Sequence, residues 1–176
     1  IFRQRDKSNN NDIGYFHQNI FSYFEGCEVP QAGWDVIYRN SDGIQMPDGD
    51  IVHTLYVEMK NKHNTMNSAS SAKTYIKMQG QILEDDDCAC LLVEAIAKKS
   101  QNIKWTTKVD GKNVQHRLIR RVSMDKFYAI LTGEEDAFYK MCMALPGVIN
   151  AVVNEEESVS VPHDTVIDEL RKVASV

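Results

Sequence analysis

An apolar run at residues 89–97 constrains the fold of this chain more than any other stretch. Glu94 is its only charged residue, and the others are Ala, Cys, Leu, Val and Ile. A strand this apolar is buried on both faces, as the central strands of α/β sheets are. Before it, a β-branched and aromatic segment at 53–57 is followed by a helical apolar pattern from about 68 to 83. The order strand, helix, strand predicts two parallel neighbours joined by a crossover helix.

The length and composition suit one α/β domain. The chain has 176 residues, 43% of them apolar, which is enough for a globular domain with its own core. We expect residues 1–176 to form a single domain with a mixed central sheet flanked by helices. The N-terminus is expected to be incomplete, because the chain begins at Ile1 without Met.

No apolar run is long enough to span a membrane, so no membrane partner is expected. The four cysteines lack a metal-finger spacing and are predicted to be buried thiols in a reducing cytoplasm.

Capping and turn signals place the remaining elements. A cap at residues 9–12 predicts a first helix that Gly26 ends. Strands at 33–38 and 53–60 form a predicted hairpin around the turn at 40–43, and strands at 105–109 and 114–122 form a second one around 110–111. Further helices are expected from about 123 to 132, from about 134 to 144 with an end before Pro146, and from about 163 to 173.

The first predicted hairpin brings together two acids and a lysine. If its second strand runs through Lys60, then Glu58 and Lys60 project from one face about 7 Å apart at Cα, and Asp35 comes beside Glu58. Asp48 is the alternative partner acid, but it lies in a Pro-Asp-Gly-Asp sequence typical of tight turns, whereas strand formers flank Asp35. The other interpretation of Asp35 is a plain strand-edge acid. Carboxylates bind divalent metals, and a neighbouring lysine can position water and offset charge in phosphodiester hydrolysis.

A longer string around these residues is more specific than the acid-x-Lys triplet within it. The stretch Glu58-Met59-Lys60-Asn61-Lys62-His63-Asn64-Thr65-Met66-Asn67-Ser68 closely resembles the active-site segment of type II restriction endonucleases that cut the palindrome GGNCC. Those enzymes belong to the PD-(D/E)XK nuclease superfamily. The resemblance covers about half of the chain well. It departs from the superfamily pattern because no proline precedes Asp35.

The resemblance implies a restriction-endonuclease-like core and Mg²⁺-dependent hydrolysis of double-stranded DNA, with Mn²⁺ able to substitute. It assigns metal binding to Asp35, Glu58 and the backbone carbonyl of Met59. It assigns the positioning of the attacking water to Lys60. In many nucleases of this superfamily the first helix supplies an auxiliary acid, and Gln18 could stand in that place or be an ordinary solvated residue.

Polar and basic side chains after Lys60 suggest DNA contacts. Asparagine, lysine, histidine and threonine side chains hydrogen-bond base edges and phosphates, and Lys62 is the candidate for guanine. The lysines at the start of the crossover helix could grip phosphates or form a solvated face. The basic strand at 116–121 could contact phosphates or carry stray surface cations. The DNA-binding candidates are Asn61, Lys62, His63, Asn64, Thr65, Asn67, Ser68, Lys73, Lys77, Arg117, Arg120 and Arg121.

A palindromic target implies a homodimer with one active site per strand. It also implies a functional pairing with a DNA methyltransferase, without a stable complex, in a prokaryotic cytoplasm. The formal charge of −5 argues against a general nucleic-acid coat protein but does not exclude a nuclease. Three alternatives remain open: a structure-specific repair or recombination nuclease of the same fold, a catalytically silent DNA-binding module, and a metal nuclease based on His53 and His63.

Overall fold

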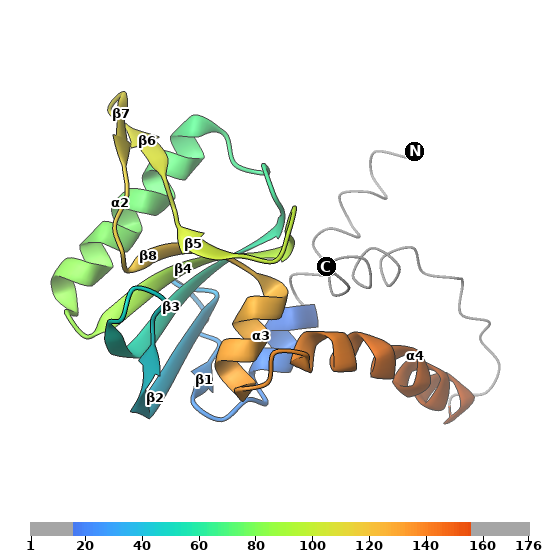
Figure 1. Cartoon of the computed structure of the whole chain (residues 1–176). Coiled ribbons are helices and arrows are strands. Elements are labelled where there is room, and N and C mark those ends of the chain that lie inside the picture. The colour runs from blue at the N-terminus through green and yellow to red at the C-terminus, as the bar shows by residue number, and fades with distance from the viewer. Residues whose placement is uncertain (1–15, 156–176) are drawn as a thin grey trace, which may run out of the picture.

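The protein is a mixed α/β fold built on a six-stranded sheet, as the sequence predicts (Figure 1). The computed structural model describes residues 16–155. The strand order is β1 (Cys27–Glu28), β2 (Val36–Gln45), β3 (Ile51–Lys62), β4 (Cys88–Ile96), β8 (Ile119–Ser123), β5 (Asn102–Lys104), and a separate hairpin pairs β6 (Thr107–Val109) with β7 (Lys112–Val114). The helices are a first one over residues 16–21 of the described range, α2 (Ser68–Glu84), α3 (Met124–Thr132) and α4 (Ala137–Glu155).

The β3-α2-β4 unit is the predicted parallel crossover. β3 and β4 pair in parallel, with Glu58 beside Leu92 and Lys60 beside Glu94. All residues of β4 except the last are buried, as its composition predicts. Successive residues of β4 enter different cores, because side chains alternate across a strand: Leu91 and Val93 pack with the aromatic cluster of the first helix, α3 and α4, whereas Cys90 and Leu92 pack against α2.

The helices therefore cover the sheet from opposite sides (Figure 1). On one side, Tyr75 and Met78 of α2 are fully buried together with Trp105. On the other side, Phe21, Phe127, Tyr128 and Phe138 form a ring-on-ring cluster. Because Glu58 and Leu92 are register partners, Glu58 and Lys60 lie on the α2 side of the sheet.

Three predicted elements differ from the structure. The first helix ends at residue 21 and is followed by turns up to Gly26, so Gly26 does not end it directly. The second hairpin is smaller than expected, because the predicted return strand is interrupted at 115–118 and its second half, β8, pairs in parallel with β4 and antiparallel with β5. α4 was expected to end before Pro146, but it continues through that residue to Glu155. Proline removes one helical hydrogen bond, while its fixed φ is itself helical, and here the helix continues past that loss.

Other expectations fall partly or wholly outside residues 16–155. The helix cap at residues 9–12 and the helix at about 163–173 lie outside the described residues. None of the four cysteines, all of which lie within the described residues, forms a disulfide; three of them are buried and Cys27 is half-buried. None of the described helices is long and apolar enough to cross a membrane.

Candidate active site

The β2–β3 pairing places Asp35 beside Glu58. Val36 pairs with Val57, and the same antiparallel register continued by one residue sets Asp35 next to Glu58. The backbone N–H of Asp35 donates to the carbonyl of Val57 at 3.0 Å. Its side chain is held by two donors: the Met59 N–H at 2.6 Å and the Gln18 amide at 3.0 Å. The hairpin therefore assembles the acid pair that the sequence predicts, and Gln18 of the first helix reaches it.

Two lysines hold the Glu58 carboxylate. Lys60 Nζ lies 2.8 Å from Oε1, and Lys77 Nζ lies 2.9 Å from Oε2. Lys60 comes from the same strand, whereas Lys77 comes from α2. The Lys77 ammonium also donates to the carbonyl of Gly33 and lies 3.8 Å from the centre of the Trp34 ring. Lys77 was predicted either to grip a phosphate or to lie on a solvated face, and the structure places its ammonium against the candidate metal ligand Glu58.

The two carboxyl groups differ in their proton affinity. Burial raises the pKa of Asp35, and the charge of Glu58 raises it further, against the lowering effects of the Met59 N–H, Lys60 and Lys77. Burial also acts to raise the pKa of Glu58, but the hydrogen bonds and charges of Lys60 and Lys77 outweigh it and leave that pKa lowered. Closely spaced acids with opposed pKa shifts, at least half buried, are typical of functional sites.

The donor set fits a hard divalent cation of the Mg²⁺ type. Mg²⁺ sites use one or two carboxylates and complete their coordination with water and substrate phosphates. Asp35 and Glu58 supply two carboxylates side by side. Within residues 16–155 there is no cluster of three or more acidic, His or Cys side chains able to hold a metal, so a backbone carbonyl and the substrate would have to complete the shell.

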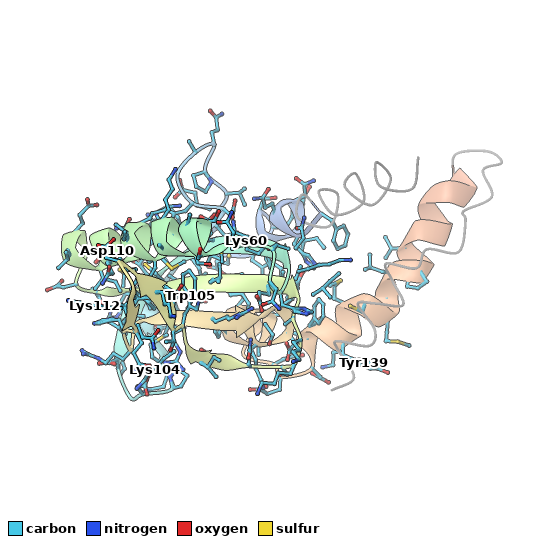
Figure 2. The ribbon with its side chains drawn as sticks, turned by 90° about the horizontal axis from the view of Figure 1, so that it is seen from above. Lys60, Lys104, Trp105, Asp110, Lys112 and Tyr139 are labelled. Atoms are coloured by element: carbon cyan, nitrogen blue, oxygen red, sulfur yellow. The ribbon has the colours of Figure 1, made fainter. Side chains whose placement is uncertain are left out.

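A groove of about 470 Å³ opens next to Lys60 between the end of β3 and the start of α2. Figure 2 shows Lys60 on the α2 side of the ribbon. Three predicted DNA-binding residues, Asn61, Lys62 and Thr65, line the groove together with Lys60. Its remaining lining residues are Met59, Met66, Ser70 and Thr74.

The other candidates of the polar segment shape the turn into α2. His63 is tied to the carbonyl of Ile96 through its N–H, and Asn64 adopts a left-handed φ of 58°. Asn67 caps α2 by accepting a hydrogen bond from the Ser70 N–H at 2.8 Å. Ser68, at the first position of α2, and Lys73 are exposed.

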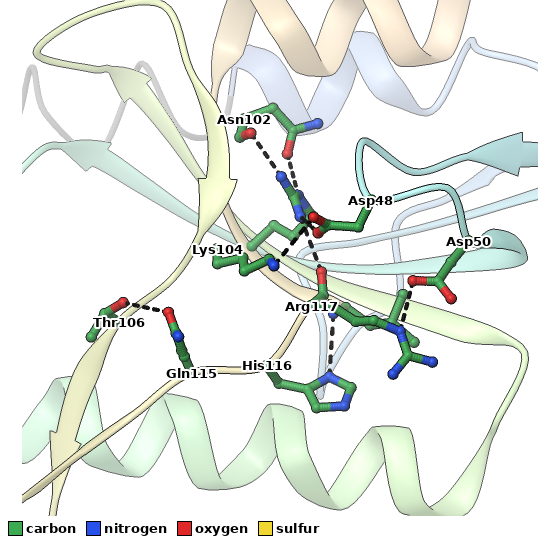
Figure 3. Close-up of polar contacts among 10 residues, drawn as sticks. Asp48, Asp50, Asn102, Lys104, Thr106, Gln115, His116 and Arg117 are labelled. Carbon is green, nitrogen blue, oxygen red and sulfur yellow. Dashed lines mark hydrogen bonds and ion pairs between the residues drawn. The ribbon is translucent and has the colours of Figure 1, made fainter.

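The predicted arginine candidates lie on and before β8, each in an ion pair. Arg117 binds Asp50 at 2.7 Å, Arg121 binds Glu94 at 2.5 Å, and Arg120 binds Asp48 at 2.6 Å. The Arg117–Asp50 pair and the contacts around Asp48 and Asn102 are visible in Figure 3. Arg120 is only 3% exposed, so its guanidinium is turned inward in this structure.

Asp48, the alternative acid, lies at the far end of β2 from Asp35. It pairs with Lys104 and Arg120 and has no place beside Glu58. His53, the start of the alternative histidine site, pairs with Asp87. Gly33, Trp34 and Glu94 are neighbours of the site residues that the sequence did not predict. A signal for Trp34 was present, since it directly precedes Asp35, but which helix it faces depends on the fold.

Comparisons with known proteins agree on one family. Residues 1–154 match the family described as Eco47II restriction endonuclease. The chain is 30% identical over 152 residues to the type II restriction enzyme Sau96I of Staphylococcus aureus, covering 82% of this chain and 54% of that protein. It is 26% identical over 175 residues to the type II restriction enzyme Eco47II of Escherichia coli, covering 92% of this chain and 69% of that protein. The chain thus spans about half the length of the first relative. No solved structure matches.

Proposed function

Because the chain belongs to the Eco47II restriction endonuclease family, we propose that it is a type II site-specific deoxyribonuclease. The membership confirms the predicted resemblance of this chain to type II restriction enzymes. The observation that carries the activity is the convergence of Asp35, Glu58 and Lys60 at one point of the β2–β3 hairpin. We further infer that this chain forms a single nuclease domain, and that it acts on DNA in a bacterial cytoplasm.

In this proposal, Asp35, Glu58 and the carbonyl of Met59 would hold a divalent cation, Mg²⁺ or in its place Mn²⁺. When bound, such a cation polarises the scissile phosphate and lowers the pKa of water. The Met59 N–H and Gln18 fix the orientation of the Asp35 carboxylate. Lys60 would orient the attacking water and offset charge that develops on the phosphate. Attack in line with the bond between phosphorus and the 3′ oxygen breaks that bond and leaves a 5′-phosphate, while the 3′ oxygen takes up the proton that the water gives up and becomes a 3′-hydroxyl.

DNA readout is proposed for the groove beside Lys60. Asn61, Lys62 and Thr65 line this groove directly after the catalytic residues, and Lys62 is the candidate for the O6 and N7 atoms of guanine. The proposed target is GGNCC, on the strength of the likeness in the active-site segment. A palindrome requires a two-fold homodimer, and host protection requires a DNA methyltransferase that acts separately.

The test is a digest of unmethylated DNA with Mg²⁺ followed by sequencing of the fragment ends. Discrete ends within GGNCC support the proposal in full. Discrete ends at another palindrome retain the restriction activity and reject the target. Cutting only at branched junctions would indicate a structure-specific nuclease, and tight binding without cleavage would indicate a silent binding module. Lys60→Ala should abolish Mg²⁺-dependent cutting, whereas Lys112→Ala, on the distant β6–β7 hairpin, should not.

A further inference from the structure

The Lys77 ammonium lies beside Glu58, in a place where three groups of the protein favour a positive charge. Its ammonium contacts one carboxylate oxygen of Glu58 at 2.9 Å, the carbonyl oxygen of Gly33, and the face of Trp34 at 3.8 Å. A carboxylate, a carbonyl and an aromatic face all attract positive charge. Lys73, one helical turn earlier on α2, is exposed instead. The position of Lys77 is therefore a property of this place in the fold and not of a lysine-rich helix face.

The charges at this place balance without a metal. Asp35 and Glu58 carry two negative charges when ionised, and Lys60 and Lys77 carry two positive charges, so the cluster is close to neutral. A divalent cation that binds Glu58 then meets two ammonium groups at close range. Such like charges within about 4–6 Å disfavour binding strongly in a partly buried site. A DNA phosphate brings the negative charge that the cluster lacks.

The two lysines differ in what they can do when the substrate arrives. Lys60 sits two residues from Glu58 on the same strand, so its place is fixed by the sheet. Lys77 belongs to another element and keeps two further partners, Gly33 and Trp34, when it releases Glu58. Its side chain is 35% exposed, so part of it can be reached by a phosphate from outside.

We propose that Lys77 couples cation binding to DNA binding. In the DNA-free protein its ammonium holds one oxygen of Glu58 and weakens the site for divalent cations. When DNA binds, a backbone phosphate takes over the ammonium, and the released carboxylate oxygen becomes available to the cation. The inference rests on the proposed nuclease function. By linkage, the same factor by which DNA raises cation affinity must be the factor by which the cation raises DNA affinity.

The experiment measures cation affinity rather than cleavage. Ca²⁺ is titrated calorimetrically into the whole protein, alone and with a GGNCC duplex that a gel shows to stay intact. In Lys77→Met, Ca²⁺ binding without DNA should tighten about tenfold, and the gain on adding DNA should shrink by about the same factor. Lys77→Gln should behave alike, whereas Lys77→Arg should retain the coupling. Lys112→Met removes the same charge far from Lys60 (Figure 2) and should leave both affinities unchanged.

The outcomes separate this inference from the function on which it rests. Wild-type coupling that persists unchanged in Lys77→Met and Lys77→Gln overturns the role of Lys77 and leaves the nuclease proposal intact. Weaker Ca²⁺ binding in both variants without DNA also overturns it, because Lys77 would then support the site. Failure of the wild type and all variants to bind Ca²⁺, with DNA or without, overturns the nuclease proposal together with the inference.

Discussion

The two ends of strand β2 carry aspartates in opposite electrostatic situations. Asp35 precedes the strand and lies beside a second acid, Glu58. Asp48 follows the strand, and its carboxylate is matched by Arg120 at 2.6 Å and Lys104 at 3.2 Å (Figure 3). At the first end, the charge of a neighbouring acid works against ionisation. At the second end, Lys104 of β5 and Arg120 of β8 stabilise the ionised form of Asp48.

The pKa shifts express this difference. Burial and Glu58 raise the pKa of Asp35. At Asp48 desolvation acts to raise the pKa, but the hydrogen bonds and charges of Lys104 and Arg120 together outweigh it, and the pKa is lowered. An acid that folding makes harder to ionise lowers stability at neutral pH, and a bound cation can offset that cost, whereas an acid that folding makes easier to ionise stabilises the structure by itself. The two aspartates at the ends of β2 therefore have different roles: Asp35 is a candidate cation ligand, and Asp48 stabilises the fold.

The largest expected effect comes from Asp35→Asn. The amide keeps the size of the side chain, and its oxygen can still accept from Met59, but it loses the charge that would bind the cation. Single-turnover cleavage under Mg²⁺ should fall by about 10³-fold, on the order of 4 kcal/mol in the barrier. Circular dichroism should show an intact fold.

The matched change at the other end of β2 is Asp48→Asn. Here the cleavage rate per folded molecule should stay within about threefold of the wild type, because Asp48 does not contact the Asp35–Glu58 pair. An inactive but folded Asp48→Asn protein, combined with an active Asp35→Asn protein, would reverse the assignment of the metal-binding acid.

The next largest effect is on stability and concerns Arg120. Its guanidinium donates to Asp48, to the Asn102 side chain and carbonyl, and to the Arg117 carbonyl. Arg120→Met should lower the free energy of unfolding by about 2–3 kcal/mol, since these charge-assisted bonds are lost in a buried place. Urea unfolding measures the loss. Contact between Arg120 and a DNA phosphate stays a prediction. If Arg120 binds a phosphate, DNA binding by Arg120→Met should depend less on salt than that of the wild type, by about one ion.

These two regions show which contacts could be predicted from the sequence and which could not. The acid pair was predictable because strand alternation and a short turn fix the register of a hairpin, and the register fixes Asp35 against Glu58. The burial of Arg120 could not be predicted, because its partner Asp48 lies 72 residues away in the sequence. Without that partner, the basic strand has the pattern of a surface patch. The contact between Lys77 and Glu58 was also hidden, since it depends on how α2 is rotated over the sheet. Local periodicity carries no information on that rotation.

A smaller effect is expected from Gln18→Ala. Within residues 16–155, the Gln18 amide donates a hydrogen bond to Asp35 at 3.0 Å and makes none to Glu58. Partners of this kind orient ligands, and their loss lowers metal affinity or activity by about tenfold. The Mg²⁺ concentration that gives half-maximal cleavage should therefore rise by about that factor. Gln18→Glu should not restore cleavage if the amide acts by orienting Asp35, because an ionised carboxylate cannot donate to a second carboxylate. A wild-type Mg²⁺ dependence in Gln18→Ala would place Gln18 outside the site.

The smallest effect is on the pH dependence of stability, and it has opposite signs at the two ends of β2. For Asp48, whose folded pKa is lowered below the usual 3.8, the unfolded chain takes up the proton first, so its stabilisation is present above that value and is lost as pH falls through the folded pKa. For Asp35, whose folded pKa is raised above 3.8, stability is highest below 3.8 and declines as pH rises through the folded pKa.

Urea unfolding of the two asparagine variants, at neutral pH and at pH values below about 3, measures this contrast. Relative to the wild type, Asp48→Asn should be less stable at neutral pH and Asp35→Asn more stable, and both differences should shrink in acid because the wild-type carboxyl groups become neutral as well. Added Mg²⁺ and DNA should then stabilise the wild type more than Asp35→Asn, since only the wild type keeps the acid that a cation relieves. Two variants that shift stability in the same direction would mean that the two ends of β2 are electrostatically alike, and that Asp35 is a structural acid.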